Sequence, residues 1–452
     1  MELNVNREEI LNGNIVKGLI KLALPLMLLN LINTLYSIVD TYFVAKIGEL
    51  QVGAITLVSP ITGCGIAFSF GLSAAGVAMI ARSLGENNNE KANKIATHLI
   101  ILAISLGIII TLTCVIFSSQ FLGWLNTPSD IYEYTFDYYI AISFDYVFLF
   151  LLTIYQAIRQ SSGDSKSGAR INIIASLLNC VLDPLFIFVF KMGTFGAALA
   201  TVLSKALMCP FVFKGLYDQS NPVSISFKDY KIDFKLMLNI IRVSIPASLG
   251  HLLSSFGFVL MSREIVSYGS IVMSGYGIGS SISSIFYIPV DTVGLSLPTY
   301  IGQNLGANNP KRAKQCYSSA IKIVLIISLV TIIIGLNTCK YFVFLFIKDA
   351  SDELLKIAVE YASFCIATSF FMGWFNSLCG VFDGSTNTKI SMVLSAARIL
   401  FIRMPIVYLL ARVTNLQYTG IWVSMIISNF ITCSIGQILY FKYPWDKKAI
   451  KV

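Results

Sequence analysis

The sequence predicts an all-α, polytopic membrane protein in which twelve transmembrane helices form two six-helix lobes. Three observations support this prediction. The 452 residues are 56% hydrophobic and only 13% charged, whereas about 25% of the residues in soluble domains are charged. Apolar segments of about 20 residues, long enough to cross a bilayer, recur along the whole chain. Polar motifs of the first half of the chain also reappear in the second half.

The twelve spans are expected at residues 15–46, 52–80, 95–118, 137–159, 170–190, 194–215, 240–266, 272–298, 317–338, 357–382, 390–411 and 419–441. Most lysines and arginines, such as Arg82, Lys94 and Arg312, then fall on the side of the membrane that holds the N-terminus. By the positive-inside rule, both termini are expected in the cytoplasm of a multi-pass protein of the cell membrane. The same distribution accounts for the net charge of +9 without nucleic acid as a partner.

An internal repeat divides the chain. The segment ARSLGENNNEKA (81–92) matches GQNLGANNPKRA (302–313), and the same offset relates Pro25 to Pro246 and Pro184 to Pro405. Because six spans per repeat return the chain to its starting side, the two LGxNN turns are expected on one membrane face. The predicted lobes are residues 1–220 and 221–452, joined by a polar segment.

Polar side chains follow one face of two of the spans. The first span carries Asn33, Ser37 and Asp40, and the fifth carries Asn172, Ser176, Asn179 and Asp183. Spacings of three and four residues place each set on a single helical face. Acidic residues inside a membrane span are costly to insert into the bilayer and are usually functional.

The expected topology brings some of these groups to one depth. Asp40, Asp183 and Thr201 each lie six to eight residues inside the same outer surface, roughly 9–12 Å at about 1.5 Å per residue. Their oxygens, with the Asn179 amide, suit a hard cation such as Na⁺, and two close carboxylates also suit a shared proton. The repeat partners of Asp40, Asn179 and Asp183 are Met261, Leu400 and Met404. The predicted site therefore belongs to one lobe only.

Several motifs occur in an order that resembles a known family. They are LALPLMLLN, the LGENN and LGANN turns, IRQSSGDSK, and NCVLDPLFIF followed by GTFGAALAT. From about residue 15 to residue 440, the chain resembles the MATE (multidrug and toxic compound extrusion) family. This resemblance implies a cation-coupled antiporter that has two lobes around a central cleft and exports drugs and metabolites.

The resemblance also implies roles for single residues. Acids and amides at the positions of Asp40, Asn179 and Asp183 would bind the coupling Na⁺ or H⁺, and no other cofactor is expected. Gln156 resembles a further amide position of the family, although its place in the fourth span puts it nearer the inner surface. Thr201 and Asn33 complete the expected cation-coupling set.

The substrate cavity is expected to include Asp145, which lies at the favoured depth, and also Tyr36, Met261, Asp291 and Tyr287. Methionines and aromatic side chains suit a pliable cavity for a small amphipathic substrate. Asp291 lies in a span, as do Arg398 and Arg403. Either these charges pair between helices or they face a charged group of the substrate.

Two other functions were weighed. Buried arginines would suit a flippase of the same superfamily that moves a lipid-linked saccharide or another lipid. An enzyme or an ATP-driven pump would need a catalytic constellation, but the sequence has no HExxH and no GxxxxGK[ST] motif. A transporter without enzymatic activity, working as a monomer in the bilayer, is the preferred prediction. The sequence does not choose between Na⁺ and H⁺ and does not identify the substrate.

Overall fold

The structure is a computed structural model that describes residues 5–125, 127–227, 231–346 and 351–447. Within these ranges the regular secondary structure is entirely helical. The α-helices are α1 (Arg7–Asn12), α2 (Ile15–Ala45), α3 (Glu49–Gly85), α4 (Asn89–Ile116), α5 (Ser118–Trp124), α6 (Tyr132–Ser143), α7 (Asp145–Ser161), α8 (Ser165–Pro184), α9 (Gly193–Ala206), α10 (Cys209–Tyr217), α11 (Phe234–Val266), α12 (Ser270–Gly306), α13 (Pro310–Phe346), α14 (Asp352–Ala367), α15 (Ser369–Gly384), α16 (Thr388–Ala396), α17 (Met404–Val407) and α18 (Thr419–Lys442). Three π-helical segments are η1 (Leu185–Val189), η2 (Ala397–Arg403) and η3 (Tyr408–Val413).

The twelve predicted spans are confirmed. In the described part of the chain, 11 segments are long and apolar enough to cross a membrane, and the pair α14 and α15, bent by 49°, makes the twelfth. Most of the helices extend beyond the predicted limits, because a helix continues through polar residues at the membrane surface that hydropathy excludes. The short helices α1 and α5 had no apolar segment to predict them.

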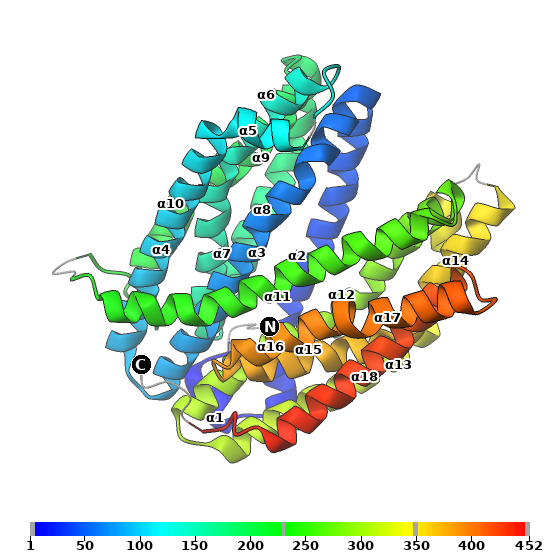
Figure 1. The fold of residues 1–452 in the computed structure, drawn as a ribbon. Coiled ribbons are helices and arrows are strands. Elements are labelled where there is room, and N and C mark those ends of the chain that lie inside the picture. The colour runs from blue at the N-terminus through cyan, green and yellow to red at the C-terminus, as the bar shows by residue number, and fades with distance from the viewer. Residues whose placement is uncertain (1–4, 126, 228–230, 347–350, 448–452) are drawn as a thin grey trace.

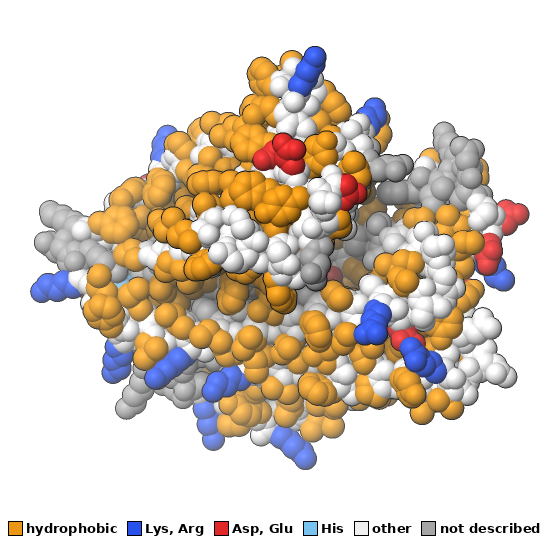
Figure 2. All heavy atoms as spheres, turned by 45° about the horizontal axis from the view of Figure 1, so that its top comes forward, with side chains coloured by type: hydrophobic (Ala, Val, Ile, Leu, Met, Phe, Trp, Pro, Cys, Tyr) orange, Lys and Arg blue, Asp and Glu red, His pale blue; other side chains and the backbone are white. Residues whose placement is uncertain are grey.

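The two halves of the chain, α1–α10 and α11–α18, form two groups of helices (Figure 1). They converge at the end of the molecule that holds α1 and the last turn of α18, and they diverge toward the opposite end, where α6 and α14 lie. Figure 2 turns the diverging end toward the viewer and shows a largely hydrophobic surface with a hollow across it. We call these ends the closed end and the open end.

Hydrogen bonds join the two halves at the closed end. Gln160 Nε2 of α7 donates to the carbonyl of Leu295 in α12 at 2.7 Å, and Thr299 Oγ1 donates back to the carbonyl of Gln160 at 3.1 Å. One turn further along α12, Gln303 Nε2 donates to the carbonyl of Ser161 at 2.8 Å. The residues that face the other half therefore recur every four positions along α12, which is the spacing of one helical face.

The two LGxNN turns form part of this contact, and they lie on one face as predicted. A Cβ atom placed on Gly85 would lie 2.1 Å from the backbone oxygen of Gln303, so only glycine allows this approach. Asn87 and Asn308, equivalent in the repeat, both have a positive φ, 58° and 54°. Asparagine tolerates that conformation better than other residues with a side chain, which explains its recurrence in both motifs.

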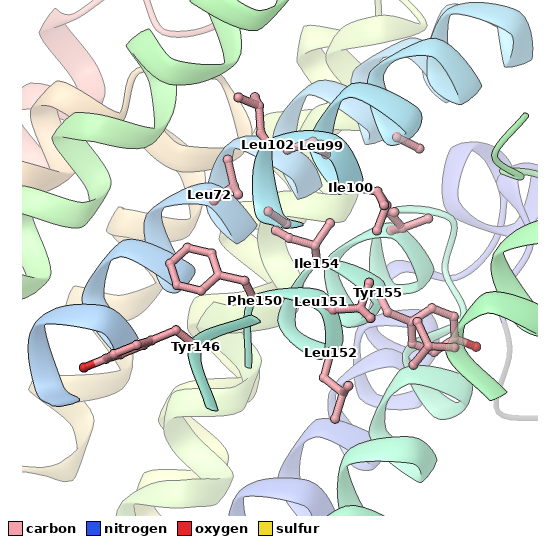
Figure 3. Close-up of a cluster of buried hydrophobic side chains, with 14 of the residues drawn as sticks. Leu72, Leu99, Ile100, Leu102, Tyr146, Phe150, Leu151, Leu152, Ile154 and Tyr155 are labelled. Carbon is pink, nitrogen blue, oxygen red and sulfur yellow. The ribbon is translucent and has the colours of Figure 1, made fainter. Parts of the chain in front are cut away.

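The first long helix of each half packs in the core of the other half. Leu19 and Leu22 of α2 belong to a buried cluster otherwise formed by α1, the second half and the segments flanking them. Conversely, Ile240 and Val243 of α11 belong to the large cluster of the first half. Figure 3 shows the centre of that large cluster, where α3, α4 and α7 meet.

In both α2 and α11, a proline follows the residues that pack in the core of the other half. Pro25 lies three residues after Leu22, and Pro246 lies three residues after Val243, inside helices that continue beyond them. Since proline donates no backbone hydrogen bond, each position weakens the helix just beyond the last residue that belongs to the hydrophobic cluster of the opposite half. These two prolines are therefore candidate hinges.

The connection between the halves ends at Asp233, the N-cap of α11. Its carboxylate accepts a 2.8 Å bond from Lys94 Nζ and a 3.0 Å bond from the backbone N–H of Leu236. The Lys94 bond, followed by the backbone bond, lowers the pKa of Asp233 to about 2. A lowered pKa stabilises the folded state above the ordinary pKa of the group, and this contribution is lost as the pH falls toward the folded value.

We therefore expect Asp233→Ala to lower the thermal unfolding temperature of the purified protein at neutral pH. Asp233→Asn, which keeps a capping oxygen, should lower it less. The difference between the wild type and the alanine variant should shrink as the pH falls from about 4 toward about 2. Equal unfolding temperatures at pH 7 would show that this cap contributes nothing.

Candidate cation and substrate site

Two carboxylates meet inside the first half of the chain. Asp40 of α2 and Asp183 of α8 lie within side-chain hydrogen-bonding reach of each other. Asp183 is fully buried, and its Oδ1 has no hydrogen-bond donor among the described residues. Two adjacent ionised carboxylates repel each other unless a proton or a cation lies between them.

An amide and a hydroxyl complete this group. Asn179 lies one turn before Asp183 on α8 and is 2% exposed. In the amide orientation that satisfies its neighbours, its nitrogen donates to Asp183 Oδ2 at 2.8 Å and to Tyr36 Oη at 3.2 Å. Thr201 Oγ1 of α9 lies 3.3 Å from the same amide. The structure therefore brings Asp40, Asn179, Asp183 and Thr201 together, which is consistent with the common depth predicted from the sequence.

The neighbouring helix geometry is irregular. Pro184 directly follows Asp183, and the π-helical segment η1 begins at the next residue. π-Helical segments occur often at functional sites. In the second half, Pro405, the repeat partner of Pro184, also lies close to π-helical segments, η2 and η3. The repeat therefore preserves the irregular backbone but not the acids.

A cavity of about 350 Å³ opens beside the acid pair and is lined only by residues of the first half. Its polar lining includes Tyr36, Asp40, Tyr138, Asp145, Thr201 and Lys205, and its apolar lining includes Ile55, Ile66 and Leu149. Carboxylates beside aromatic and aliphatic walls suit a small amphipathic molecule that carries positive charge. Tyr36 and Asp145 are thus found in a cavity, as predicted.

Lys205 was missed by the sequence analysis. Its Nζ lies 2.5 Å from Asp145 Oδ2, in an ion pair at the cavity wall. One signal was available, because Lys205 lies four residues after Thr201 and therefore on the same face of the sixth span. The shared face with Thr201 could therefore have indicated that Lys205 lies near the site.

Two expected cation-coupling residues lie away from the acid pair. Asn33 Oδ1 accepts a 2.9 Å hydrogen bond from Ser176 Oγ. Asn33 lies about 10 Å along α2 from Asp40, at 1.5 Å per residue. Gln156 of α7 packs against Gly168, about 22 Å along α8 from Asp183 on the same scale. The polar faces of α2 and α8 do meet, but the structure does not bring Asn33 or Gln156 to the site.

In the described part of the second half, a pairing of Asp291 with an arginine, one of the two alternatives left open by the sequence, is not found. Asp291 Oδ1 accepts a 2.8 Å bond from Asn376 Nδ2, and among the described residues Asp291 has no ion pair within 4.0 Å. Arg403 instead donates to Ser428 Oγ at 3.0 Å and to Asn429 Oδ1 at 2.8 Å. The Arg398 guanidinium lies over the Phe375 ring at 4.2 Å from its centre.

Met261 and Tyr287 serve packing in this structure. Met261 is fully buried in a cluster with Ile265 and Trp422, so in this structure it packs in a core. Tyr287 donates its hydroxyl hydrogen to the carbonyl of Cys365 at 2.9 Å and packs against the same cluster. Neither lines the cavity beside the acid pair. The sequence could not distinguish a methionine in a core from one in a cavity.

A helical membrane protein with an internal repeat, and with paired acids beside a cavity in one repeat, has the architecture of a secondary transporter. The family model MatE matches residues 25–185 and 246–409, two segments whose starts are separated by the repeat offset of 221 (246 − 25). The chain therefore belongs to the MATE family, as the sequence resemblance implied.

Individual proteins agree with this assignment. The chain is 24% identical over 434 residues to "Probable multidrug resistance protein YoeA" of Bacillus subtilis (strain 168), covering 94% of this chain and 93% of that protein. It is also 24% identical over 447 residues to "Multidrug export protein MepA" of Staphylococcus aureus (strain N315), covering 96% and 95%. A solved structure described as the outward-facing conformation of a multidrug resistance MATE family transporter matches with a TM-score of 0.92, at 22% identity over 98% of both chains.

Proposed function

We propose that this protein exports small amphipathic molecules across the cell membrane in exchange for Na⁺ or H⁺. The observation that carries the proposal is the contact of Asp40 with Asp183, whose buried Oδ1 has no donor among the described residues, together with the apolar counterparts of both acids in the repeat. A group that needs a proton or cation, beside a cavity for a substrate, is what an antiporter requires. The names of the curated relatives support drug export as the direction of transport.

The proposed movement is a rocking of two lobes, residues 1–220 and 221–452, which alternately open the two ends. The closed end, with α1, would face the cytoplasm, in keeping with the basic residues of its segments. To open it, the bonds of Gln160 and Gln303 across the halves must break. Because α2 and α11 are each anchored in the opposite half, this opening must bend them, and Pro25 and Pro246 lie where the bending is needed.

The coupling cation can shift the balance between the two conformations of the protein only if it binds one conformation more tightly than the other. A ligand shifts a two-state balance by as much as its affinities for the two states differ. Asp40 lies on α2 beyond Pro25 and Asp183 on α8, so bending of α2 would change their separation. Cation binding would then favour the conformation in which the two carboxylates are close, which is the one described here.

The test is dye transport into everted membrane vesicles, or dye transport by proteoliposomes that contain the purified protein as a monomer. A cationic dye should be transported when a Na⁺ or H⁺ gradient is imposed, and dissipation of that gradient with an ionophore should stop transport. Dye movement of the same rate with and without either gradient would contradict ion-coupled antiport.

The flippase alternative is not favoured. It was based on buried arginines that would meet a lipid-linked phosphate, but the Arg403 guanidinium is bonded to Ser428 and Asn429 inside the second half. Arg403 is 1% exposed, and it does not present a free guanidinium to the hollow between the halves. The named relatives are also multidrug export or resistance proteins.

A further inference from the structure

Lys205 is the only basic side chain among the cavity-lining residues that the structure describes. Its partner Asp145 is 7% exposed, and Asp145 Oδ1 has no hydrogen-bond partner in that part of the chain. The side chain of Lys205 is more exposed than that of Asp145, which it contacts. The lysine can therefore leave, whereas the buried carboxylate would have to be compensated by another positive charge.

A second carboxylate site lies within the same cavity. Asp40 lines it together with Lys205. Thr201, one turn before Lys205 on α9, lies 3.3 Å from Asn179, which bonds to Asp183. Side chains on an α-helix lean toward its N-terminus, so Lys205 leans toward Thr201 and the acid pair. A lysine side chain is long and flexible enough to serve either site.

The charges of the cavity permit a one-for-one exchange. The charged groups that line it are Asp40, Asp145 and Lys205, with the buried Asp183 next to Asp40, while Tyr36, Tyr138 and Tyr146 contribute neutral hydroxyls. With a monovalent cation at the acid pair and Lys205 at Asp145, two positive charges meet three carboxylates. If a cationic substrate takes Asp145 and Lys205 takes the acid pair, the count is unchanged once the coupling cation has left.

We propose that Lys205 is a tethered ammonium that moves from Asp145 to the Asp40–Asp183 pair when a cationic substrate binds Asp145, and that it thereby expels the coupling cation. This inference rests on the proposed function and adds the residue that links substrate binding to ion release. It also assigns a specificity role to Lys205, because only a positively charged substrate replaces an ammonium at Asp145. A neutral molecule of the same shape would leave the lysine and the coupling cation in place.

The experiment uses the full-length protein in detergent, with tetraphenylphosphonium as the cationic probe and triphenylphosphine oxide as its neutral analogue. Binding of radioactive sodium, or uptake and release of protons, reports the occupancy of the acid pair. In the wild type, saturating tetraphenylphosphonium should weaken coupling-cation binding by about tenfold, within the usual range for coupled sites. Triphenylphosphine oxide should have no such effect.

Lys205→Met removes the tethered competitor. Tetraphenylphosphonium should then bind about tenfold more tightly, because it no longer displaces an ammonium, while its effect on coupling-cation binding falls to under about threefold. Lys314→Met is the matched control, because Lys314 also forms an ion pair, 2.7 Å from Asp446, but lies outside the cavity. Unchanged probe affinity and unchanged cation release in Lys205→Met would overturn the proposal.

If the unpaired Asp145 prevents Lys205→Met from folding, the double variant Asp145→Asn/Lys205→Met removes both charges. It should show no probe-driven release of the coupling cation, and persistent release in it would also overturn the proposal. Asp40→Asn tests the proposed function separately from the role of Lys205. If wild-type cation binding does not depend on Asp40, the proposed function itself fails, whatever Lys205 does.

Discussion

Asp183→Asn and Asp40→Asn are each expected to reduce ion-driven efflux to the level of vesicles without the protein. Asparagine keeps the size of the side chain but removes the charge that holds a cation or exchanges a proton. Since Asp183 is fully buried beside Asp40, the neutral variant should also relieve repulsion between the carboxylates. Folding and membrane insertion should therefore be retained, as judged by a monodisperse elution profile in detergent.

The controls come from the other repeat. Met261→Leu and Met404→Leu change the positions that correspond to Asp40 and Asp183 but conserve volume and polarity, so both should leave efflux and its ion dependence nearly unchanged. Efflux by both Asp→Asn variants with unaltered dependence on pH and Na⁺ would show that the acid pair does not couple transport.

A disulfide across the closed end is expected to stop transport in a reversible way. A Cβ atom on Gly302 of α12 would lie 2.9 Å from the Cβ atom of Ala81 in α3. Disulfides need a separation of about 3.8 Å, so a small outward shift would accommodate the bond. In a variant without the nine native cysteines, oxidised Ala81→Cys/Gly302→Cys should lose efflux, and a reducing agent should restore it.

A disulfide inside one half provides the control. A Cβ atom on Gly76 of α3 would lie 3.6 Å from the Cβ atom of Ala157 in α7, and both helices belong to the first half. Oxidised Gly76→Cys/Ala157→Cys should therefore transport normally if the halves move as units. Undiminished efflux by the oxidised Ala81→Cys/Gly302→Cys protein would rule out a mechanism that needs separation of the halves at this end.

The coarse architecture followed from local patterns in the sequence. Hydropathy identified twelve spans because each helix in a bilayer must satisfy its own backbone and cover it with apolar side chains. The LGxNN motifs revealed the repeat because asparagine at positive φ and a following N-cap are local requirements of the turn. The three- and four-residue spacing also predicted which side chains of α2 and α8 share a face.

The distance of each residue from the end of its span was enough to predict part of the site. Asp40, Asp183 and Thr201 lie at similar distances from the ends of their spans, and the structure brings them together around Asn179. Depth also agreed with the position of Gln156, which lies against Gly168 and away from the acid pair. Family resemblance suggested it, while the residue count had already placed it nearer the other membrane surface.

Local sequence patterns were enough to predict the helical membrane fold, its repeat, and the restriction of the acid pair to one half. Contacts between helices set the remaining features: Lys205 pairs with Asp145, Asp291 bonds to Asn376 instead of an arginine, and Met261 lies in a core. The physical reason is that hydropathy and spacing describe one helix at a time. Contacts between helices depend on the rotation and tilt of each helix against its neighbours, which packing of the whole molecule sets.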